Sequence, residues 1–238
     1  MQIELLTDRR PMLQLRAAQQ PGRVYSRVAV DAAVESAVIG LEWSFWQTKG
    51  IASCDGIPLP TATDDALWAF VKDVSPVDLL SDAEVTDFEA YYHQAEGELG
   101  YPGTMDDHLT GLVTFPSSAY DGMSPIGVPR PAYSPAPMQD IDAWLRGEGE
   151  RILLVYGEYD PWTGGMFELG GATDSLRVIA PMGSHYSGIV SLAPGDRDAA
   201  LAKLEAWSGV TPDVSVWDQA RLAAAPPRVR TPPMIHRR

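Results

Sequence analysis

Two short apolar runs constrain the fold of this chain more than any other feature. Residues 152–156 read Ile-Leu-Leu-Val-Tyr, residues 176–180 read Leu-Arg-Val-Ile-Ala, and turn-forming residues bound both runs. Runs of this length without strict alternation are typical of strands in the centre of a parallel sheet, where both faces are buried. The two runs therefore predict parallel strands and place the chain in the α/β class.

Residues 1–100, in contrast, show mostly helical periodicity. A helix capped by Asp31 is predicted to run to about Thr48, because its apolar residues recur at helical spacing. Ser81 and Glu84 have the spacing of a capping box that opens a helix to about Leu99. We further expect a helix over residues 1–20 that Pro11 interrupts, and shorter helices at residues 64–73, 140–146 and 196–207.

Prolines mark the segment between these two regions. Residues 101–137 carry seven prolines and are predicted to form a long connector. Residues 211–238, which include the run Ala-Ala-Ala-Pro-Pro, are predicted to be a disordered tail.

Composition excludes several classes of function. The net charge of −14 argues against binding nucleic acid, which needs clusters of basic residues. A single cysteine, Cys54, excludes an internal disulfide and a cysteine zinc site, and we expect no cofactor. No apolar run is long enough for a membrane span, and the N-terminus lacks the pattern of a signal peptide. The sequence does not indicate the cellular compartment of the chain.

Asp160 and His185 are the candidate catalytic residues. Each follows the end of a predicted strand, where side chains of a parallel sheet face the ligand crevice. Their order and their separation of 25 residues fit the acid and the histidine of a Ser-acid-His triad. In that arrangement the imidazole takes the proton of a serine hydroxyl, and the carboxylate orients the imidazole.

Spacing alone leaves an alternative open, since Asp160 and His185 can equally be two ordinary loop residues. His108 lies beside Asp106 and Asp107, so these three residues are a candidate metal site, although a solvated loop is the simpler interpretation. No metal is otherwise expected.

Four segments of the chain resemble, in order, those of secreted bacterial tripeptidyl aminopeptidases, a serine peptidase family with a prolyl-oligopeptide-releasing subgroup. The segments are Leu41–Gln47, Tyr91–Pro102 (in the parts Tyr-Tyr-His-Gln-Ala and Leu-Gly-Tyr-Pro), Val155–Trp162 and Ala180–His185. The resemblance covers residues 5–210.

The resemblance implies an incomplete α/β-hydrolase fold. Residues 1–137 would be a helical cap with its proline-rich connector, and residues 138–210 would be the last strands and helices of the hydrolase core. It implies that Asp160 is the triad acid and His185 the general base. It further implies a peptide substrate with a free amino terminus and a secreted or periplasmic parent enzyme.

The chain departs from the family pattern at the nucleophile. No Gly-x-Ser-x-Gly occurs in it, and Ser124, Ser117, Ser118 and Ser184 all have the wrong context or spacing. A histidine and an acid without a nucleophile cannot form an acyl-enzyme, so we expect the isolated chain to be inactive.

Three explanations of the missing serine remain open. The chain is a truncated product, one half of a split enzyme whose second chain supplies the serine, or a non-catalytic remnant that binds peptides or a partner. An esterase would need a serine that we do not find. Because the early strands are also missing, we expect the chain to be marginally stable, oligomeric or dependent on a partner.

Overall fold

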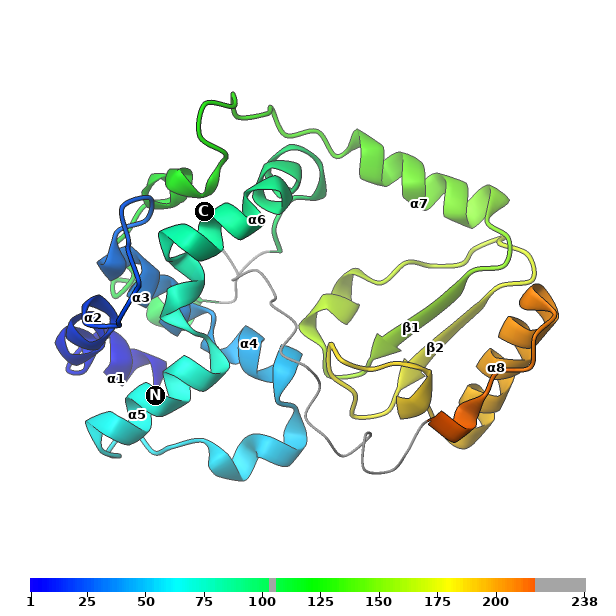
Figure 1. The fold of residues 1–238 in the computed structure, drawn as a ribbon, viewed down its shortest axis with the longest axis horizontal. Coiled ribbons are helices and arrows are strands. Elements are labelled where there is room, and N and C mark those ends of the chain that lie inside the picture. The colour runs from blue at the N-terminus through cyan, green and yellow to red at the C-terminus, as the bar shows by residue number, and fades with distance from the viewer. Residues whose placement is uncertain (103–105, 217–238) are drawn as a thin grey trace. The chain divides into compact units, whose positions relative to one another are not determined.

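The computed structural model describes residues 1–102 and 106–216. Within them, the helices and strands are α1 Gln2–Leu6, α2 Arg10–Ala18, α3 Val30–Ile39, α4 Leu41–Thr48, α5 Asp64–Val74, α6 Asp82–Gln94, α7 Ala136–Glu148, β1 Leu153–Gly157, β2 Leu176–Ala180 and α8 Pro194–Ser208 (Figure 1). The predicted order of helices first and parallel strands late is confirmed, and the fold is mixed α and β.

The chain divides into two compact units. We call the first the helical unit; among the described residues it consists of Met1–Phe45 and Ser53–Pro137 without residues 103–105. The second, the sheet unit, consists of residues 138–216 together with the distant segment Trp46–Ala52. Helix α4 therefore begins in one unit and ends in the other.

Helix α3 is the centre of the helical unit. Every residue from Ala32 to Ile39 is buried, because α1, α2 and the 3₁₀ turn Val77–Leu80 pack around it. A helix that is apolar nearly all round is stable only when neighbours cover all its sides. Its small residues, such as Ala32 and Ala33, let those neighbours approach closely.

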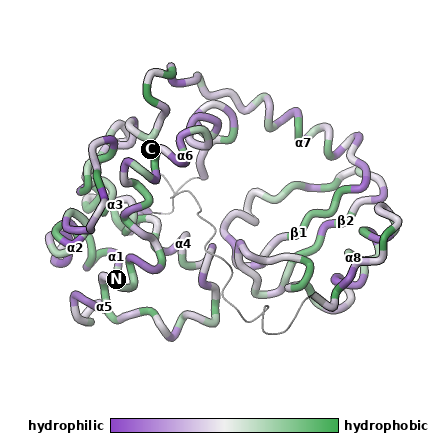
Figure 2. Tube along the Cα trace, in the orientation of Figure 1, coloured by the Kyte–Doolittle hydropathy of each residue, from purple (hydrophilic) through white to green (hydrophobic). Residues whose placement is uncertain are grey.

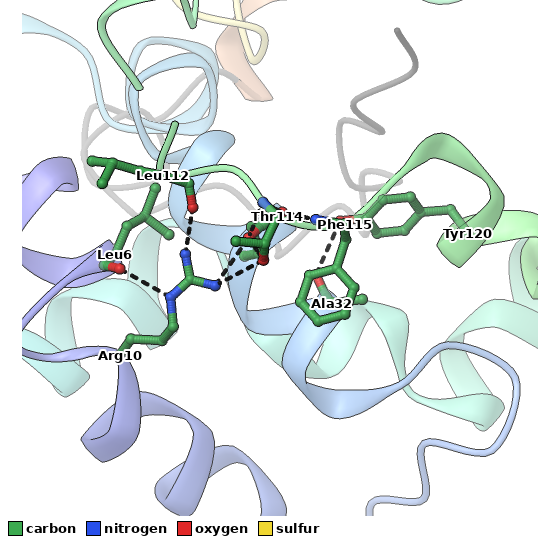
Figure 3. A network of polar contacts seen from close by, with 8 residues as sticks. Leu6, Arg10, Ala32, Leu112, Thr114, Phe115 and Tyr120 are labelled. Atoms are coloured by element: carbon green, nitrogen blue, oxygen red, sulfur yellow. Dashed lines mark hydrogen bonds and ion pairs between the residues drawn. The ribbon is translucent and has the colours of Figure 1, made fainter. Parts of the chain in front are cut away.

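The one charged side chain buried within α3 is Glu35, which is fully buried and fully paired. Its carboxylate accepts hydrogen bonds from Arg10 at 2.9 Å, from the Thr114 backbone and hydroxyl at 2.7–3.0 Å, and from the Phe115 backbone at 2.9 Å. Arg10 also donates to the carbonyl oxygens of Leu6 and Leu112 (Figure 3). This network attaches the proline-rich connector to α3.

Several helix boundaries differ from the sequence prediction. The predicted helix from Asp31 to Thr48 is two helices, α3 and α4, separated at Gly40. Asp31 lies in the first turn of α3 and does not cap it, since the cap position is Ala29. The break predicted in the helix over residues 1–20 is present, but it lies at residues 7–9, between α1 and α2. Pro11 itself lies in the first turn of α2, where the missing N–H costs nothing.

The capping box at Ser81 is also wrong in detail. Helix α6 begins where predicted, but the Ser81 side chain makes no cap hydrogen bond. The next residue, Asp82, instead accepts hydrogen bonds from the Ser26 and Arg27 backbone amides at 2.8 and 2.9 Å. A tertiary contact has thus replaced the local one. At its other end α6 continues as a π-helical turn over Ala95–Leu99 and stops at Gly100, which has a φ of +75°.

Helix α7 is longer than the predicted residues 140–146, because Pro137 is accepted in its first turn and Gly147 within its last. Of the predicted tail, residues 217–238 lie outside the described residues, and Val214–Val216 form a 3₁₀ turn.

The sheet unit is built on β1 and β2, which pair in parallel with Leu153 opposite Leu176 and Gly157 opposite Ala180. Leu153–Val155 form an unbroken hydrophobic stretch of β1 (Figure 2). One face of the sheet packs on a core of buried side chains that includes Ala200 of α8, and α8 lies alongside β2 (Figure 1). The parallel register brings the carboxyl ends of both strands to the same edge.

Candidate functional site

The loops that follow β1 and β2 are held together by backbone hydrogen bonds. The Tyr159 N–H donates to the Gly183 carbonyl at 2.8 Å, and the Glu158 N–H donates to the Ala180 carbonyl at 3.1 Å. The Glu158 carboxylate accepts from the Met182 N–H at 2.7 Å. These bonds run from one loop to the other, so the residues that follow are brought close in space.

Asp160 and His185 meet at this edge. The imidazole Nδ1 of His185 lies 2.8 Å from Oδ2 of Asp160, whose residue is only 9% exposed. The second carboxylate oxygen, Oδ1, accepts the Trp162 N–H at 3.1 Å. An ionised carboxylate only accepts hydrogen bonds, so the contact places the proton of a neutral imidazole on Nδ1. Nε2 is then the nitrogen with a free lone pair.

Two glycines make this close approach of the loops feasible. A Cβ atom on Gly157 would overlap the carbonyl oxygen of Ser184, and one on Gly183 would overlap the hydroxyl of Ser187. Met182 adopts a left-handed φ of +53°, which turns the chain sharply before the histidine. Glycine is therefore required at positions 157 and 183, because the two loops pack too closely there for a side chain.

His185 also borders a hollow in the sheet unit. The hollow has a volume of about 220 Å³, and its lining includes the strand residues Val155 and Tyr156 and the side chains of Trp162 and Ser187. The His185 side chain is 37% exposed, and among the described residues no side chain or backbone group is recorded as a hydrogen-bond partner of Nε2. A hydroxyl brought into the hollow could reach this nitrogen.

The site includes a segment that sequence reasoning did not place there. The backbone N–H of His185 donates to the carbonyl oxygen of Gln47 at 2.9 Å. The ring of Trp46 meets that of Tyr159 edge-on, with centroids 5.6 Å apart. Trp46 and Gln47 belong to the segment Leu41–Gln47, the first of the four that resemble the family, but no local pattern indicates that they contact the loops after the strands.

The other candidates lie elsewhere. Ser124 belongs to the helical unit, where its buried hydroxyl donates to the Glu96 carboxylate at 2.8–2.9 Å. Nε2 of His108 lies 3.0 Å from the side-chain oxygen of Gln2. Among residues 1–102 and 106–216 no group of three or more metal-ligating side chains is found that could hold an ion, at residues 106–108 or elsewhere. None of the helices in this part of the chain is long and apolar enough to cross a membrane.

Fold and site together define a mixed α/β protein with a paired acid and histidine at the carboxyl ends of two parallel strands. The profile of the PS-10 peptidase S37 family matches residues 1–230, and the chain belongs to that family. The expected family resemblance is thereby confirmed, and a serine-peptidase-like function is supported.

A curated relative is a prolyl tri/tetrapeptidyl aminopeptidase from Streptomyces mobaraensis. It is 34% identical to this chain over 207 residues, which make up 85% of this chain and 43% of the relative. The chain therefore spans less than half the length of this relative. No solved structure matches the chain significantly.

Proposed function

We propose that this chain supplies the acid and the general base of a serine aminopeptidase whose nucleophile lies outside these 238 residues. The observation that carries the proposal is the 2.8 Å contact between His185 Nδ1 and Asp160 Oδ2. In this geometry Asp160 holds the imidazole in the tautomer that leaves Nε2 ready to accept a proton.

The reaction follows from these roles. Nε2 of His185 takes the proton of a serine hydroxyl as the oxygen attacks the peptide carbonyl, and Asp160 stabilises the imidazolium. The imidazolium then donates its proton to the leaving amine, and an acyl-enzyme remains. In the second half of the reaction His185 accepts the proton of a water that attacks the ester, and it then returns that proton to the leaving serine oxygen. The released acyl part would be a short peptide with a free amino terminus.

The proposed substrate class is based on the relative, which is named as a prolyl tri/tetrapeptidyl aminopeptidase. The fold proposed for the intact enzyme is an α/β hydrolase, with residues 1–137 as its cap and residues 138–210 as the end of its core. In support, β1 and β2 are parallel and carry the acid and the histidine in the chain order of such hydrolases. A serine-bearing segment would complete the site beside the hollow.

A non-catalytic role is the second candidate, because no Gly-x-Ser-x-Gly occurs in the chain. A chain that cannot form an acyl-enzyme could still bind a peptide in the hollow beside His185. The two candidates differ in whether a supplied serine restores turnover.

The test is a hydrolysis assay with peptidyl-proline chromogenic substrates that carry a free amino terminus. The chain is assayed alone and mixed with the part of the Streptomyces relative outside the matched 207 residues. We expect turnover only in the mixture, and loss of about 10⁴-fold in kcat with Asp160→Asn or His185→Ala. His108→Ala, a histidine of the helical unit, is the matched control and should retain full activity.

Two other outcomes would count against the proposal. Labelling of the chain alone by a fluorophosphonate probe would place a reactive serine within it. No turnover in any mixture, together with peptide binding by the chain alone, would favour the non-catalytic role.

A further inference from the structure

We propose that Trp46 and Gln47 are positioning residues for the Asp160–His185 pair, and that they hold the two loops that carry it. The inference deepens the proposed function, since it names what fixes the proposed acid and base. It does not require that the chain be active.

The first observation is the hydrogen bond from the His185 N–H to the Gln47 carbonyl, at 2.9 Å. Gln47 is the second-last residue of α4, and the last carbonyls of a helix have no partner within the helix. The C-terminal turn of α4 therefore offers an acceptor, and the backbone of the proposed general base uses it. Gln47 is 5% exposed, so water hardly competes for this bond.

The second observation concerns the loop that carries Asp160. The Trp46 ring packs edge-on against Tyr159 with an interplanar angle of 61°, and Tyr159 directly precedes Asp160. Edge-to-face pairs at this separation are favourable beyond the area that they bury. The backbone of Tyr159 is in turn bonded to Gly183, so the ring contact acts on a loop that is already tied to β2.

Two consecutive residues thus contact both loops of the site, one through a ring and the other through a carbonyl. The 2.8 Å contact between Nδ1 and Oδ2 depends on the relative position of those loops. A shift of about 1 Å in such a geometry can cost about 100-fold in rate. The assignment of Trp46–Ala52 to the same compact unit as β1 and β2 agrees with this role.

The test measures the pair directly, on the whole chain and without substrate. Nuclear magnetic resonance gives the low-field signal of the His185 Nδ1–H and the hydrogen-exchange rate of the His185 amide. We expect Trp46→Ala to accelerate exchange of both protons by about tenfold or more, the factor that one hydrogen bond supplies. Trp46→Phe, which retains a ring, should restore most of the protection.

Trp144→Ala is the matched control, because Trp144 belongs to the sheet unit and is 50% exposed. It should leave both signals unchanged. If Trp46→Ala does not fold, Tyr159→Leu removes the same ring contact from its other side and should have the same effect. In the unmodified chain the His185 amide should exchange about tenfold more slowly than that of Tyr186, which meets the Ser184 hydroxyl at 3.4 Å.

The proposal is overturned if the His185 amide is unprotected in the unmodified chain, or if folded Trp46→Ala or Tyr159→Leu retains both signals. These outcomes are separate from the activity assay. Protection that depends on Trp46 in a chain that no serine can activate would refute the proposed function and leave the positioning role intact. In an active mixture, Trp46→Ala should lower kcat and leave KM unchanged.

Discussion

At the scale of single residues, the site depends on glycines whose neighbours leave no space for a side chain. Gly157 ends β1 opposite Ala180, and its α-carbon faces the carbonyl of Ser184, the residue before the histidine. Its lack of a side chain therefore sets how closely the two loops approach. Asp160 and His185 come within hydrogen-bond distance only because the backbones behind them are this close.

Gly157→Ala should consequently separate the loops. We expect a loss of about 1–3 kcal/mol of stability from overpacking, and loss of the low-field Nδ1–H signal of His185. Urea unfolding and nuclear magnetic resonance measure the two effects. Gly164→Ala is the control, since a Cβ there meets nothing within 4 Å. Equal stability and equal spectra for the two variants would contradict this account of Gly157.

Tyr25 gives a prediction about pH. Burial, and secondarily the nearby charge of Asp78, raise the pKa of its phenol from the ordinary 10.0 to about 12. The folded state thus retains this proton at a pH where the unfolded state loses it. The contribution to stability is fully present below pH 10 and is lost as the pH rises from about 10 to about 12.

The melting temperature of the chain should therefore fall over that pH interval, and Tyr25→Phe should make the fall less steep. Tyr133→Phe serves as the control, because Tyr133 is 57% exposed. A pH dependence that Tyr25→Phe leaves unchanged would argue against a buried, protonated phenol at this position.

At the scale of elements, the helical unit depends on how its connector is attached to α3. Glu35 is the attachment point, and its carboxylate is the acceptor for Arg10 and for the backbone amides of Thr114 and Phe115. Removing one partner of a buried ion pair leaves the remaining charge and the hydrogen-bond donors unpaired, and this costs more than the pair itself contributes to stability.

Glu35→Ala is therefore expected to lower the free energy of unfolding by about 3–5 kcal/mol. Glu35→Gln, which keeps one acceptor oxygen and the volume, should cost less. Glu42→Ala, an exposed glutamate on α4, should stay within about 0.5 kcal/mol of the unmodified chain. Urea unfolding monitored by circular dichroism compares the three, and equal losses at positions 35 and 42 would refute the assigned role of Glu35.

The elements that could be predicted from sequence are those with a strong local pattern. The strands at 153–157 and 176–180 were predictable because their apolar runs are short and bounded by turn residues, and their parallel pairing brings Asp160 and His185 together. The predicted burial of both faces is wrong for the described residues, since their sheet has two strands and most strand residues are only half-buried. The failures have tertiary causes. Ser81 has the spacing of a cap, yet Asp82 is engaged by Ser26, which lies 56 residues earlier. No local rule anticipates such a partner.

The positions of Trp46 and Gln47 were unpredictable for the same reason. Their periodicity is that of a helix packed on other helices, and it does not distinguish between the helical unit and the sheet unit. The sequence therefore predicts the acid and the histidine but not the segment that contacts both of their loops.

At the scale of the whole molecule, the two units are not consecutive pieces of chain. Trp46–Ala52 lies in the sheet unit although the helical unit precedes and follows it in sequence. A single cut in the connector therefore cannot separate the units cleanly, because one product would hold residues 46–52 and the other the strands that they contact. This arrangement predicts that a nicked chain stays together.

A protease site inserted between Ile126 and Gly127 allows that test, since Ile126 is 81% exposed and an insertion retains Gly127, whose φ is +78°. After cleavage, the two products should co-elute in size-exclusion chromatography, because Gln47 remains bonded to His185, Trp46 remains packed on Tyr159, and Arg130 remains paired with Glu96 and Asp121. Trp46→Ala should weaken the association of the products by about tenfold in Kd, and Trp144→Ala should not. Products that separate at once, or an affinity indifferent to Trp46, would mean that the segment does not hold the sheet unit.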